Sequence, residues 1–227
     1  MNKTAIMVDG GFFHKRANAL WGTNDSGSER ATRLHEYCLN HLSCRDEKSE
    51  LYRVFYYDCP PVKDNVYHPI LRKSIYLGRT HLYKWMTEFH KELTRKRKVA
   101  MRMGELSGCQ YTLRPEAVKK LFRGDLQLNS LTEADFILDI KQKGVDMKLG
   151  IDILSIALKR QVSQIVLISG DSDFIPAAKA ARREGIDFIL DPMGSHIGHD
   201  LQEHIDGLRS IASKPEPDNG TAVPYDH

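Results

Sequence analysis

Cysteines are few in this sequence, and long apolar runs are missing from it. The four cysteines form no C-x-x-C pair and are too sparse for a disulfide framework, so reduced thiols are expected. No apolar run approaches the ~20 residues that a transmembrane helix needs, and the start of the chain lacks the ~7–15-residue apolar core of a signal peptide. These absences exclude a membrane-spanning or disulfide-stapled secreted protein. We expect a cytoplasmic protein with no membrane partner.

The sequence also has little excess charge of either sign, because 33 Lys and Arg stand against 30 Asp and Glu, for a formal net charge of +3. The charges are unevenly distributed, however. Between Val62 and Arg123 there are 15 basic and 5 acidic residues, a surplus of ten, which leaves a net charge of −7 on the rest of the chain. This segregation favours a protein whose acidic part holds cations and whose basic part binds a polyanion. A solvated basic helix face explains the same numbers.

The 227 residues, 41% of them apolar, are enough for one folded domain with a substantial core. We expect that domain to span residues 1–212, with a basic helical insert over about 62–130. A polar tail rich in Pro and Gly, over 213–227, is expected to be disordered.

Short β-branched runs that end in turn residues predict buried strands in the first third of the chain. The run Thr4–Val8 stops at Asp9-Gly10-Gly11, which we interpret as a flexible turn, and Leu51–Tyr57 stops before Pro60-Pro61. Apolar residues at helical spacing predict a helix over about 31–41 between the two runs. The order strand, helix, strand is the start of a parallel sheet.

The middle of the chain is less clearly patterned. Residues 69–93 carry apolar side chains mainly on one helical face, which predicts one long amphipathic helix or two short ones with a break at Gly78. Alternation predicts a strand over 99–106, and a short basic helix is expected over 116–122. For residues 136–141, a strand and a helix compete.

The last third alternates helices and strands. We expect helices over 145–158, 173–183 and 200–211, and strands over 164–168 and 186–190. Such units, joined by short turns, give a doubly wound α/β fold in three layers with a mainly parallel central sheet.

Acidic residues follow two of the expected strands, where ligands bind in sheets of this kind. Asp9 follows the first strand, Asp171 and Asp173 follow strand 164–168, and Asp146 opens a helix that also contains Asp152. Carboxylates gathered at one edge repel each other unless a divalent cation neutralises them, and oxygen-only ligands select Mg²⁺ or Mn²⁺. Such an ion activates water for attack on a phosphodiester. For each residue alone, a helix cap or a turn explains the position.

Five segments of the sequence together resemble a known family. They are VDGGFF (8–13), FYYDCPP (55–61), KGVDMKLGIDIL (143–154), SGDSDFIPAAKAARREG (169–185) and DLQEHID (200–206). This set resembles the NYN domain in its bacterial LabA-like branch, a member of the PIN-like nuclease superfamily, over roughly residues 3–211. The resemblance implies a PIN-like Rossmannoid fold and a ribonuclease that depends on Mg²⁺ or Mn²⁺.

The resemblance also implies site residues. Asp9, Asp146 and Asp171 are carried over as catalytic residues, and the same three with Asp152 and Asp173 as metal ligands. The chain departs from the family at Gly11-Phe12-Phe13, where a small or polar residue followed by Asn is usual.

Basic residues supply candidate contacts to RNA, which we expect to be single-stranded. The run Arg95-Lys96-Arg97-Lys98 and two lysines beside the acidic group, Lys143 and Lys148, are expected to bind phosphates. A salt bridge to a neighbouring Asp explains the two lysines equally well. Aromatic residues between the basic ones suit base stacking, although core packing is the better explanation of Trp85 and Phe89. A homodimer formed through the long insert helix is compatible with the sequence.

Three functions are therefore open. The first is a metal-dependent ribonuclease that hydrolyses RNA phosphodiesters, and the second is a non-catalytic RNA-binding or regulatory module with the same fold. The third is a phosphohydrolase of the haloacid dehalogenase type, suggested by Gly170-Asp171-Ser172-Asp173. That class needs Asp-x-Asp after the first strand, and Asp9-Gly10-Gly11 lacks the second Asp.

Overall fold

The central sheet of the protein is parallel throughout. The computed structural model describes residues 2–43 and 49–211 of the chain. Six strands lie in the order β10-β9-β8-β1-β2-β5, which confirms the predicted α/β fold with a parallel sheet. Their bounds are β1 (Lys3–Asp9), β2 (Glu50–Asp58), β5 (Val99–Met103), β8 (Gln164–Ile168), β9 (Asp187–Asp191) and β10 (Gly207–Leu208).

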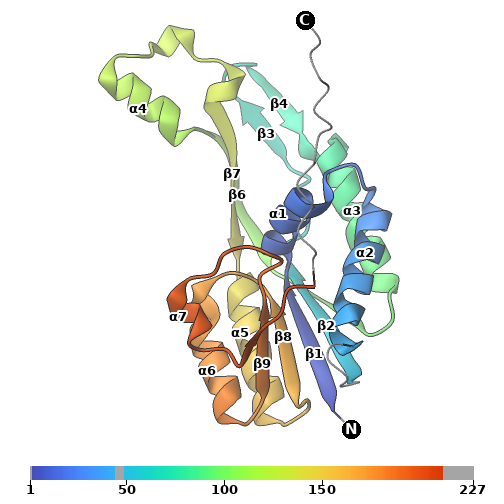
Figure 1. Ribbon diagram of the computed structural model, residues 1–227. Coiled ribbons are helices and arrows are strands. Elements are labelled where there is room, and N and C mark those ends of the chain that lie inside the picture. Colours follow the sequence, from blue (N-terminus) through green and yellow to red (C-terminus); the bar gives the residue numbers. More distant parts are fainter. Residues whose placement is uncertain (1, 44–48, 212–227) are drawn as a thin grey trace, which may run out of the picture.

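Helices cover both faces of this sheet (Figure 1). One face carries α1 (Gly10–Trp21), α2 (Gly27–Asn40), followed by the short helix η1 (His41–Ser43), and α3 (His81–Arg95). The other face carries α5 (Val145–Leu158), α6 (Ile175–Arg183) and α7 (His199–Gln202). The three predicted layers are therefore present. In the part of the chain that the structure describes, no helix is both long and apolar enough to cross a bilayer.

Strand β1 explains why its sequence is apolar without a break. Successive side chains of a strand point to opposite faces, and both faces of β1 are covered by helices. Ala5 and Met7 pack in the core on the α5 and α6 side, whereas Ile6 and Val8 pack on the α1, α2 and α3 side. All four side chains are completely buried. The sheet therefore holds Asp9, the last residue of β1, in a fixed position.

A long antiparallel arm leaves the domain next to β5. We call β6 (Glu105–Leu113), β7 (Phe136–Lys143) and the segment between them the β6–β7 arm. Its far end carries α4 (Pro115–Arg123) and the short helices η3 (Leu128–Ser130) and η4 (Glu133–Asp135) (Figure 1). The structure thus resolves residues 136–141 as a strand and confirms the short helix expected over 116–122.

The segment over about 62–130 is not the helical insert that the sequence suggested. It contributes β5, which pairs with β2 and forms one edge of the central sheet. It also contains a hairpin and one strand of the β6–β7 arm, in addition to α3 and α4. Amphipathic spacing identified the helices but did not reveal that the strand at 99–103 belongs to the main sheet.

The one long or two short helices expected over 69–93 are wrong for the first half of that range. That stretch begins in a hairpin of β3 (Asn65–His68) and β4 (Lys73–Tyr76), followed by the short helix η2 (Leu77–Arg79). Arg72 makes the turn with a φ of 49°, which helix periodicity cannot anticipate. Helix α3 starts only where the Thr80 hydroxyl accepts a hydrogen bond from the backbone N–H of Tyr83.

The helix expected over 200–211 is also wrong. Helix α7 ends at Gln202, and Gly207–Leu208 forms β10 beside Ile189 and Leu190 of β9. The Asp206 carboxylate accepts hydrogen bonds from the backbone N–H of Phe188 and from Arg182 Nε. These contacts with distant parts of the chain outweigh the local helical pattern. The tail expected over 213–227 lies outside the described residues.

The turn expected at Asp9-Gly10-Gly11 is instead the start of α1. Asp9 caps that helix, and Gly10 is its first residue. A Cβ atom on Gly10 would come within 2.7 Å of both the Tyr56 hydroxyl and the Tyr57 carbonyl oxygen. Glycine is therefore required here because the helix lies directly against β2, and not because the chain needs a flexible turn.

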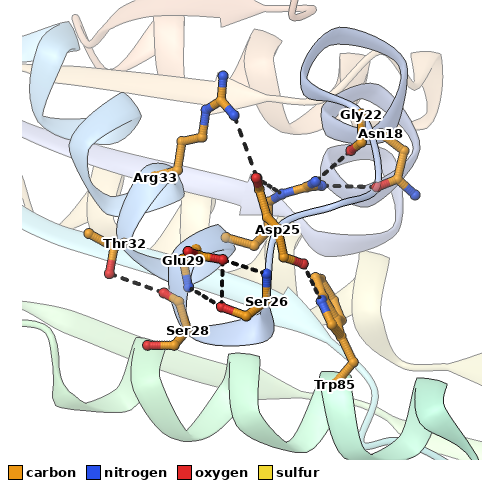
Figure 2. A network of polar contacts seen from close by, with 10 residues as sticks. Asn18, Gly22, Asp25, Ser26, Ser28, Glu29, Thr32, Arg33 and Trp85 are labelled. Atoms are coloured by element: carbon orange, nitrogen blue, oxygen red, sulfur yellow. Dashed lines mark hydrogen bonds and ion pairs between the residues drawn. The ribbon is translucent and has the colours of Figure 1, made fainter.

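A buried arginine, Arg30, joins α1 to α2, and Figure 2 labels its hydrogen-bond partners Asn18, Gly22 and Asp25. Arg30 is 1% exposed, and its guanidinium donates hydrogen bonds to Asp25 Oδ2, Asn18 Oδ1 and the Gly22 carbonyl oxygen, at 2.9, 2.9 and 2.6 Å. Trp85 of α3 donates through Nε1 to the Asp25 carbonyl oxygen at 2.8 Å. This network fixes the three helices on one face of the sheet.

Helix α3 packs against α2 and the core. Its residue Phe89 is fully buried, and the Trp85 ring stacks on the Phe89 ring, which confirms core packing for this pair. Phe89 and Leu93 of the helix considered for dimerisation are therefore occupied within the chain, whereas Leu82 at its start is 68% exposed. A homodimer stays a prediction.

Candidate active site

Four aspartates lie at the carboxyl edge of the sheet, and we call them the acidic edge: Asp9, Asp146, Asp171 and Asp173. Asp9 ends β1, and Asp171 and Asp173 follow β8, the neighbour of β1 in the sheet. Asp146 is in the first turn of α5. The two strands place their acids side by side because parallel strands β1 and β8 end at the same edge.

Ser169 holds two of these aspartates in place. This fully buried serine donates its hydroxyl to Asp9 Oδ2 at 3.1 Å and accepts a hydrogen bond from the backbone N–H of Asp171 at 3.2 Å. Asp9 Oδ1 also accepts from the backbone N–H of Phe12 at 3.1 Å. Asp171 caps the short helix η5 (Ser172–Phe174) by accepting from the backbone N–H of Asp173 at 3.0 Å. Both aspartates are therefore helix caps as well as members of the acidic edge.

The charges of the acidic edge act on one another. Burial raises the pKa of Asp9, and the negative charges of Asp146 and Asp171 raise it further, against the opposing hydrogen bonds from Phe12 and Ser169. Burial also raises the pKa of Asp146, together with the charges of Asp171 and Asp173. The four carboxyl groups therefore share one electrostatic environment in which added negative charge is unfavourable.

The acidic edge does not form a closed set of metal ligands. Across residues 2–43 and 49–211, no group of three or more histidine, cysteine, aspartate or glutamate side chains is close enough together to hold a metal ion. The donor chemistry still suits a hard cation, because all four groups are carboxylates and none carries a neutralising basic partner in the described structure. Asp146, Asp171 and Asp173 are exposed to solvent, so a hydrated ion can reach them.

Asp152 has different partners. Its Oδ2 accepts hydrogen bonds from Arg102 Nε at 2.8 Å and from the Tyr57 hydroxyl at 2.9 Å. The guanidinium already neutralises this carboxylate. These contacts of Asp152 join α5 to β2 and β5, and the structure does not bring it together with the acidic edge.

A second polar cluster lies beside Asp9, and we call it the Asp58 cluster: His14, Tyr56, Asp58 and His90. Asp58 is 4% exposed, and its Oδ2 accepts from the Tyr56 hydroxyl at 2.8 Å. The Nε2 atoms of His90 and His14 lie 3.4 and 3.6 Å from the same oxygen. Burial alone raises the pKa of Asp58, but the hydrogen bonds from His14, His90 and Tyr56 hold it well below its usual range. Asp58 is therefore ionised and fully engaged.

We expect Asp58→Asn to lower the free energy of unfolding by about 2–3 kcal/mol at pH 7, because Tyr56 and the two histidines lose a buried charged acceptor. The lowered pKa sets the sign of the pH dependence. The stability that Asp58 contributes is present above the pKa of about 4 of an unfolded Asp, and it is lost as the pH falls below that value. Urea unfolding between pH 3 and pH 7 measures the effect, with exposed Asp64→Asn as the control. A difference between Asp58→Asn and wild type that is independent of pH contradicts this explanation.

The predicted basic contacts lie at two different places. Lys143 ends β7 and Lys148 lies in α5, and Lys148 Nζ donates to the Met103 carbonyl oxygen at 2.6 Å. Lys148 and Asp146 are two residues apart in α5, so their side chains point to different sides of the helix.

The run Arg95–Lys98 lies at the amino ends of the strands, opposite the acidic edge. It precedes β5, and Lys98 Nζ contacts Glu50 Oε1 and the Leu51 carbonyl oxygen at the start of β2. Arg95 and Lys96 form ion pairs with Glu92. The five residues of β5 span about 15 Å, so the structure separates this run from the acidic edge by the length of a strand.

Phe12 and Phe13 take the positions where the family usually has a polar residue. Phe13 is fully buried in the core beneath α1. A Cβ atom on Gly170 would come within 2.8 Å of the Phe12 ring, so this ring covers the turn that carries Asp171. The departure from the family motif therefore places an apolar ring beside the acidic edge.

Sequence reasoning did not identify Ser169 or the Asp58 cluster. The sequence did contain a signal for Asp58, because this aspartate stands at the end of an apolar strand, as Asp9 and Asp171 do. Ser169 precedes the acidic turn directly, but its buried position between two carboxyl-edge aspartates depends on the neighbouring strand. His14 and His90 have no local signal, because α1 and α3 bring them to Asp58 from distant parts of the chain.

Of the comparisons with known proteins, the match to a family model agrees with the fold and with the resemblance. No curated protein matches the chain. Among solved structures, the crystal structure of a protein of unknown function from Vibrio parahaemolyticus is similar, with 14% sequence identity, a TM-score of 0.47, and coverage of 92% of this chain and 93% of that chain. A likeness at this level supports no inference about function. The model of the NYN domain family matches residues 64–206, which is more than half of the chain and includes Asp146, Asp171 and Asp173. The chain therefore belongs to the NYN domain family, within the PIN-like nuclease superfamily.

Proposed function

We propose that this protein is a ribonuclease that hydrolyses RNA phosphodiesters at the acidic edge with the help of Mg²⁺ or Mn²⁺. The observation that supports the proposal is the electrostatic coupling of the aspartates. The charges of Asp146 and Asp171 raise the pKa of Asp9, and those of Asp171 and Asp173 raise the pKa of Asp146. A divalent cation relieves this repulsion, and its positive charge attracts the phosphate groups of RNA.

The carboxylates are suited to an ion that keeps part of its water. Mg²⁺ is usually held by one or two carboxylates and several waters, so it does not need the closed group of ligands that the described residues lack. We assign this ion to the acidic edge, where one or two of Asp9, Asp146, Asp171 and Asp173 would bind it directly and the others through its waters. Asp152 is left out because Arg102 neutralises it. When bound, such an ion supplies an activated water and stabilises the leaving oxygen of a phosphodiester.

The protein's own residues position the reactants. Ser169 and the backbone N–H of Phe12 keep the Asp9 carboxylate oriented, and Ser169 ties Asp171 to it. Lys148, in the same helix as Asp146 and in contact with the end of β5, is our candidate for attracting a phosphate group, together with Lys143 at the end of β7. We leave Arg95–Lys98 out of this site, since they lie at the amino ends of the strands, opposite the acidic edge.

We expect single-stranded RNA to be cut in the presence of Mn²⁺ or Mg²⁺ and left intact with a chelator. Asp171→Asn should lower the rate by on the order of 100-fold, because it removes one negative charge from the acidic edge and leaves an acceptor oxygen for the Asp173 N–H. Gel analysis of a labelled oligonucleotide measures the rate. The control is Asp125→Asn, at an exposed aspartate of the β6–β7 arm.

Other outcomes distinguish the alternatives. Cleavage that survives Asp171→Asn, or no cleavage of any RNA with either metal, rules out this proposal. RNA binding without cleavage supports a non-catalytic module that keeps the NYN fold. Hydrolysis of small phosphate esters supports a phosphohydrolase, which the missing second Asp after β1 argues against.

A further inference from the structure

An apolar pocket of about 430 Å³ opens beside the carboxyl edge. Three parts of the chain form it: the loop of residues 58–62 after β2, the start of α3, and the base of the β6–β7 arm. Its volume is within the ~300–1,000 Å³ of small-ligand sites. Neither the acidic edge nor the Asp58 cluster explains why the protein keeps an apolar pocket at this place.

The arm contributes one face of a strand to the pocket. Leu138, Ile140 and Gln142 are alternate residues of β7, so their side chains point to the same side. Leu106 of β6 pairs with Gln142 in register and lines the pocket with it. Leu106, at the base of the arm, packs against the core of the domain, whereas Leu138 and Ile140 lie farther along the arm, which extends away from the central sheet (Figure 1).

Helix α3 forms the opposite wall with Tyr83 and Met86. Both side chains are half-buried, and they lie about two turns and one turn of helix before the fully buried Phe89. An aromatic ring and a flexible thioether facing aliphatic side chains form a slot for a flat, weakly polar group.

The polar groups of the pocket are few, and most are already engaged. The Thr80 hydroxyl donates to the Leu77 carbonyl oxygen and accepts from the Tyr83 N–H, and Asp58 is held by its own cluster. Within the described residues, the Gln142 amide has no hydrogen-bond partner. An amide that both donates and accepts matches the mixed donor and acceptor edge of a nucleobase.

The pocket comes close to the acidic edge at two places, one near Asp9 and one near Asp146. Asp58 and Cys59 line it, and a Cβ atom on Gly10, the residue after Asp9, would come within 2.9 Å of Asp58 Cβ. A Cβ atom on Gly104 would come within 3.0 Å of Cys59 Sγ and 2.6 Å of Val145, the residue before Asp146. A group in the pocket is therefore separated from the acidic edge by about one residue of the protein.

We propose that this pocket holds one unpaired nucleobase of an RNA strand whose phosphate lies at the acidic edge. The inference rests on the proposed function for the position of the phosphate. The apolar walls take the faces of the base, Tyr83 stacks on it, and Gln142 binds its polar edge. Lys148 and a cation on the acidic edge then attract the phosphate that the same sugar carries. Because a base inside a duplex cannot enter such a slot, the pocket selects single-stranded RNA.

The test measures RNA binding without cleavage. Fluorescence anisotropy in Ca²⁺ measures the binding of a short single-stranded RNA, and of the same RNA carrying one abasic site at each position in turn. The proteins compared are wild type, Tyr83→Ala, Ile140→Trp and the control Phe122→Ala. Loss of stacking costs about 1–3 kcal/mol per base, so we expect at least fivefold weaker binding for Tyr83→Ala and Ile140→Trp. Phe122→Ala, on the distant helix α4 at 89% exposure, should bind as wild type does. One abasic position should weaken wild-type binding to the same degree.

Circular dichroism checks that each variant is folded, and Tyr83→Ala carries the test if Ile140→Trp does not fold. Equal binding by folded Tyr83→Ala and wild type, equal binding of abasic and normal RNA, or no RNA binding at all would overturn the proposal. Base-dependent binding without cleavage in Mn²⁺ would leave the pocket in place and rule out only the ribonuclease. Cleavage at unchanged rates on every abasic RNA would rule out only the pocket.

Discussion

Asp9→Asn should reduce the metal-dependent cleavage of RNA by on the order of 100–1,000-fold and, at the same time, make the metal-free protein more stable. The loss of activity follows from the central position of Asp9, which ends β1 and is coupled to both Asp146 and Asp171. The amide is close in shape to the carboxylate and still caps α1 through the Phe12 N–H, so the fold should be retained.

The gain in stability follows from the raised pKa of Asp9. Burial and the neighbouring charges penalise its ionised form, and a neutral amide removes that penalty. Stabilising substitutions at strained functional sites commonly contribute about 0.5–2 kcal/mol, which raises the Tm of a protein of this size by about 2–4 °C for each kcal/mol. Calorimetry in the presence of a chelator measures the change.

The pH dependence provides an independent test of this explanation. A carboxyl group with a raised pKa in the folded state contributes stability below the unfolded pKa of about 4, and that contribution is lost as the pH rises through the folded pKa. Metal-free wild type should therefore lose stability above pH 4 more steeply than Asp9→Asn. Asp125→Asn, at an exposed position, should follow wild type. If the stability of wild type and of Asp9→Asn depends equally on pH, or if Asp9→Asn has a lower Tm, the ionised Asp9 carboxylate does not destabilise the metal-free protein.

Arg30→Met should lower the free energy of unfolding by about 3 kcal/mol. The buried guanidinium is the donor for Asp25, Asn18 and the Gly22 carbonyl oxygen (Figure 2), and an aliphatic side chain of similar length leaves all three acceptors without it. Removing one member of a buried, hydrogen-bonded ion pair typically costs about 3–5 kcal/mol. We take the lower end of this range because the Asp25 side chain is 22% exposed and keeps some contact with water.

Arg33→Met is the matched control for this prediction. Arg33 approaches the same carboxylate, with Nη1 at 3.5 Å from Asp25 Oδ2, but its side chain is 45% exposed. Exposed ion pairs contribute about 0.2–1 kcal/mol, so Arg33→Met should cost less than 1 kcal/mol. Urea unfolding at pH 7 compares the two variants. If both cost the same, burial of Arg30 is not the cause of its contribution.

The acidic residues show how far local sequence reasoning reaches. Apolar runs that stop at Asp9 and at Ser169-Gly170-Asp171 predict strand ends, and the parallel order of strands brings those ends to one edge. The same reasoning placed Asp146 at the start of a helix, where the structure has it. That these aspartates bind a metal and cut RNA stays a prediction, as do the LabA-like branch and the cytoplasmic location.

The basic residues show where local reasoning stops. Arg95–Lys98 and Lys143 are both expected from the sequence to bind phosphates, but β5 runs between the first group and the carboxyl edge. A count of charge along the chain has no information about which end of a strand faces which edge. These candidate contacts therefore do not lie together at one end of the sheet.

By itself, the sequence determined the parallel α/β sheet and the positions of its strand-terminal acids, because burial on both faces and turn residues leave a local pattern. Only the tertiary structure decided that Ser169 joins Asp9 to Asp171, that His14 and His90 meet at Asp58, and that the arm and α3 enclose a pocket. Each of these contacts joins residues from different elements, and most are far apart in the chain. Their energy comes from packing and hydrogen bonds that no local pattern of residues encodes.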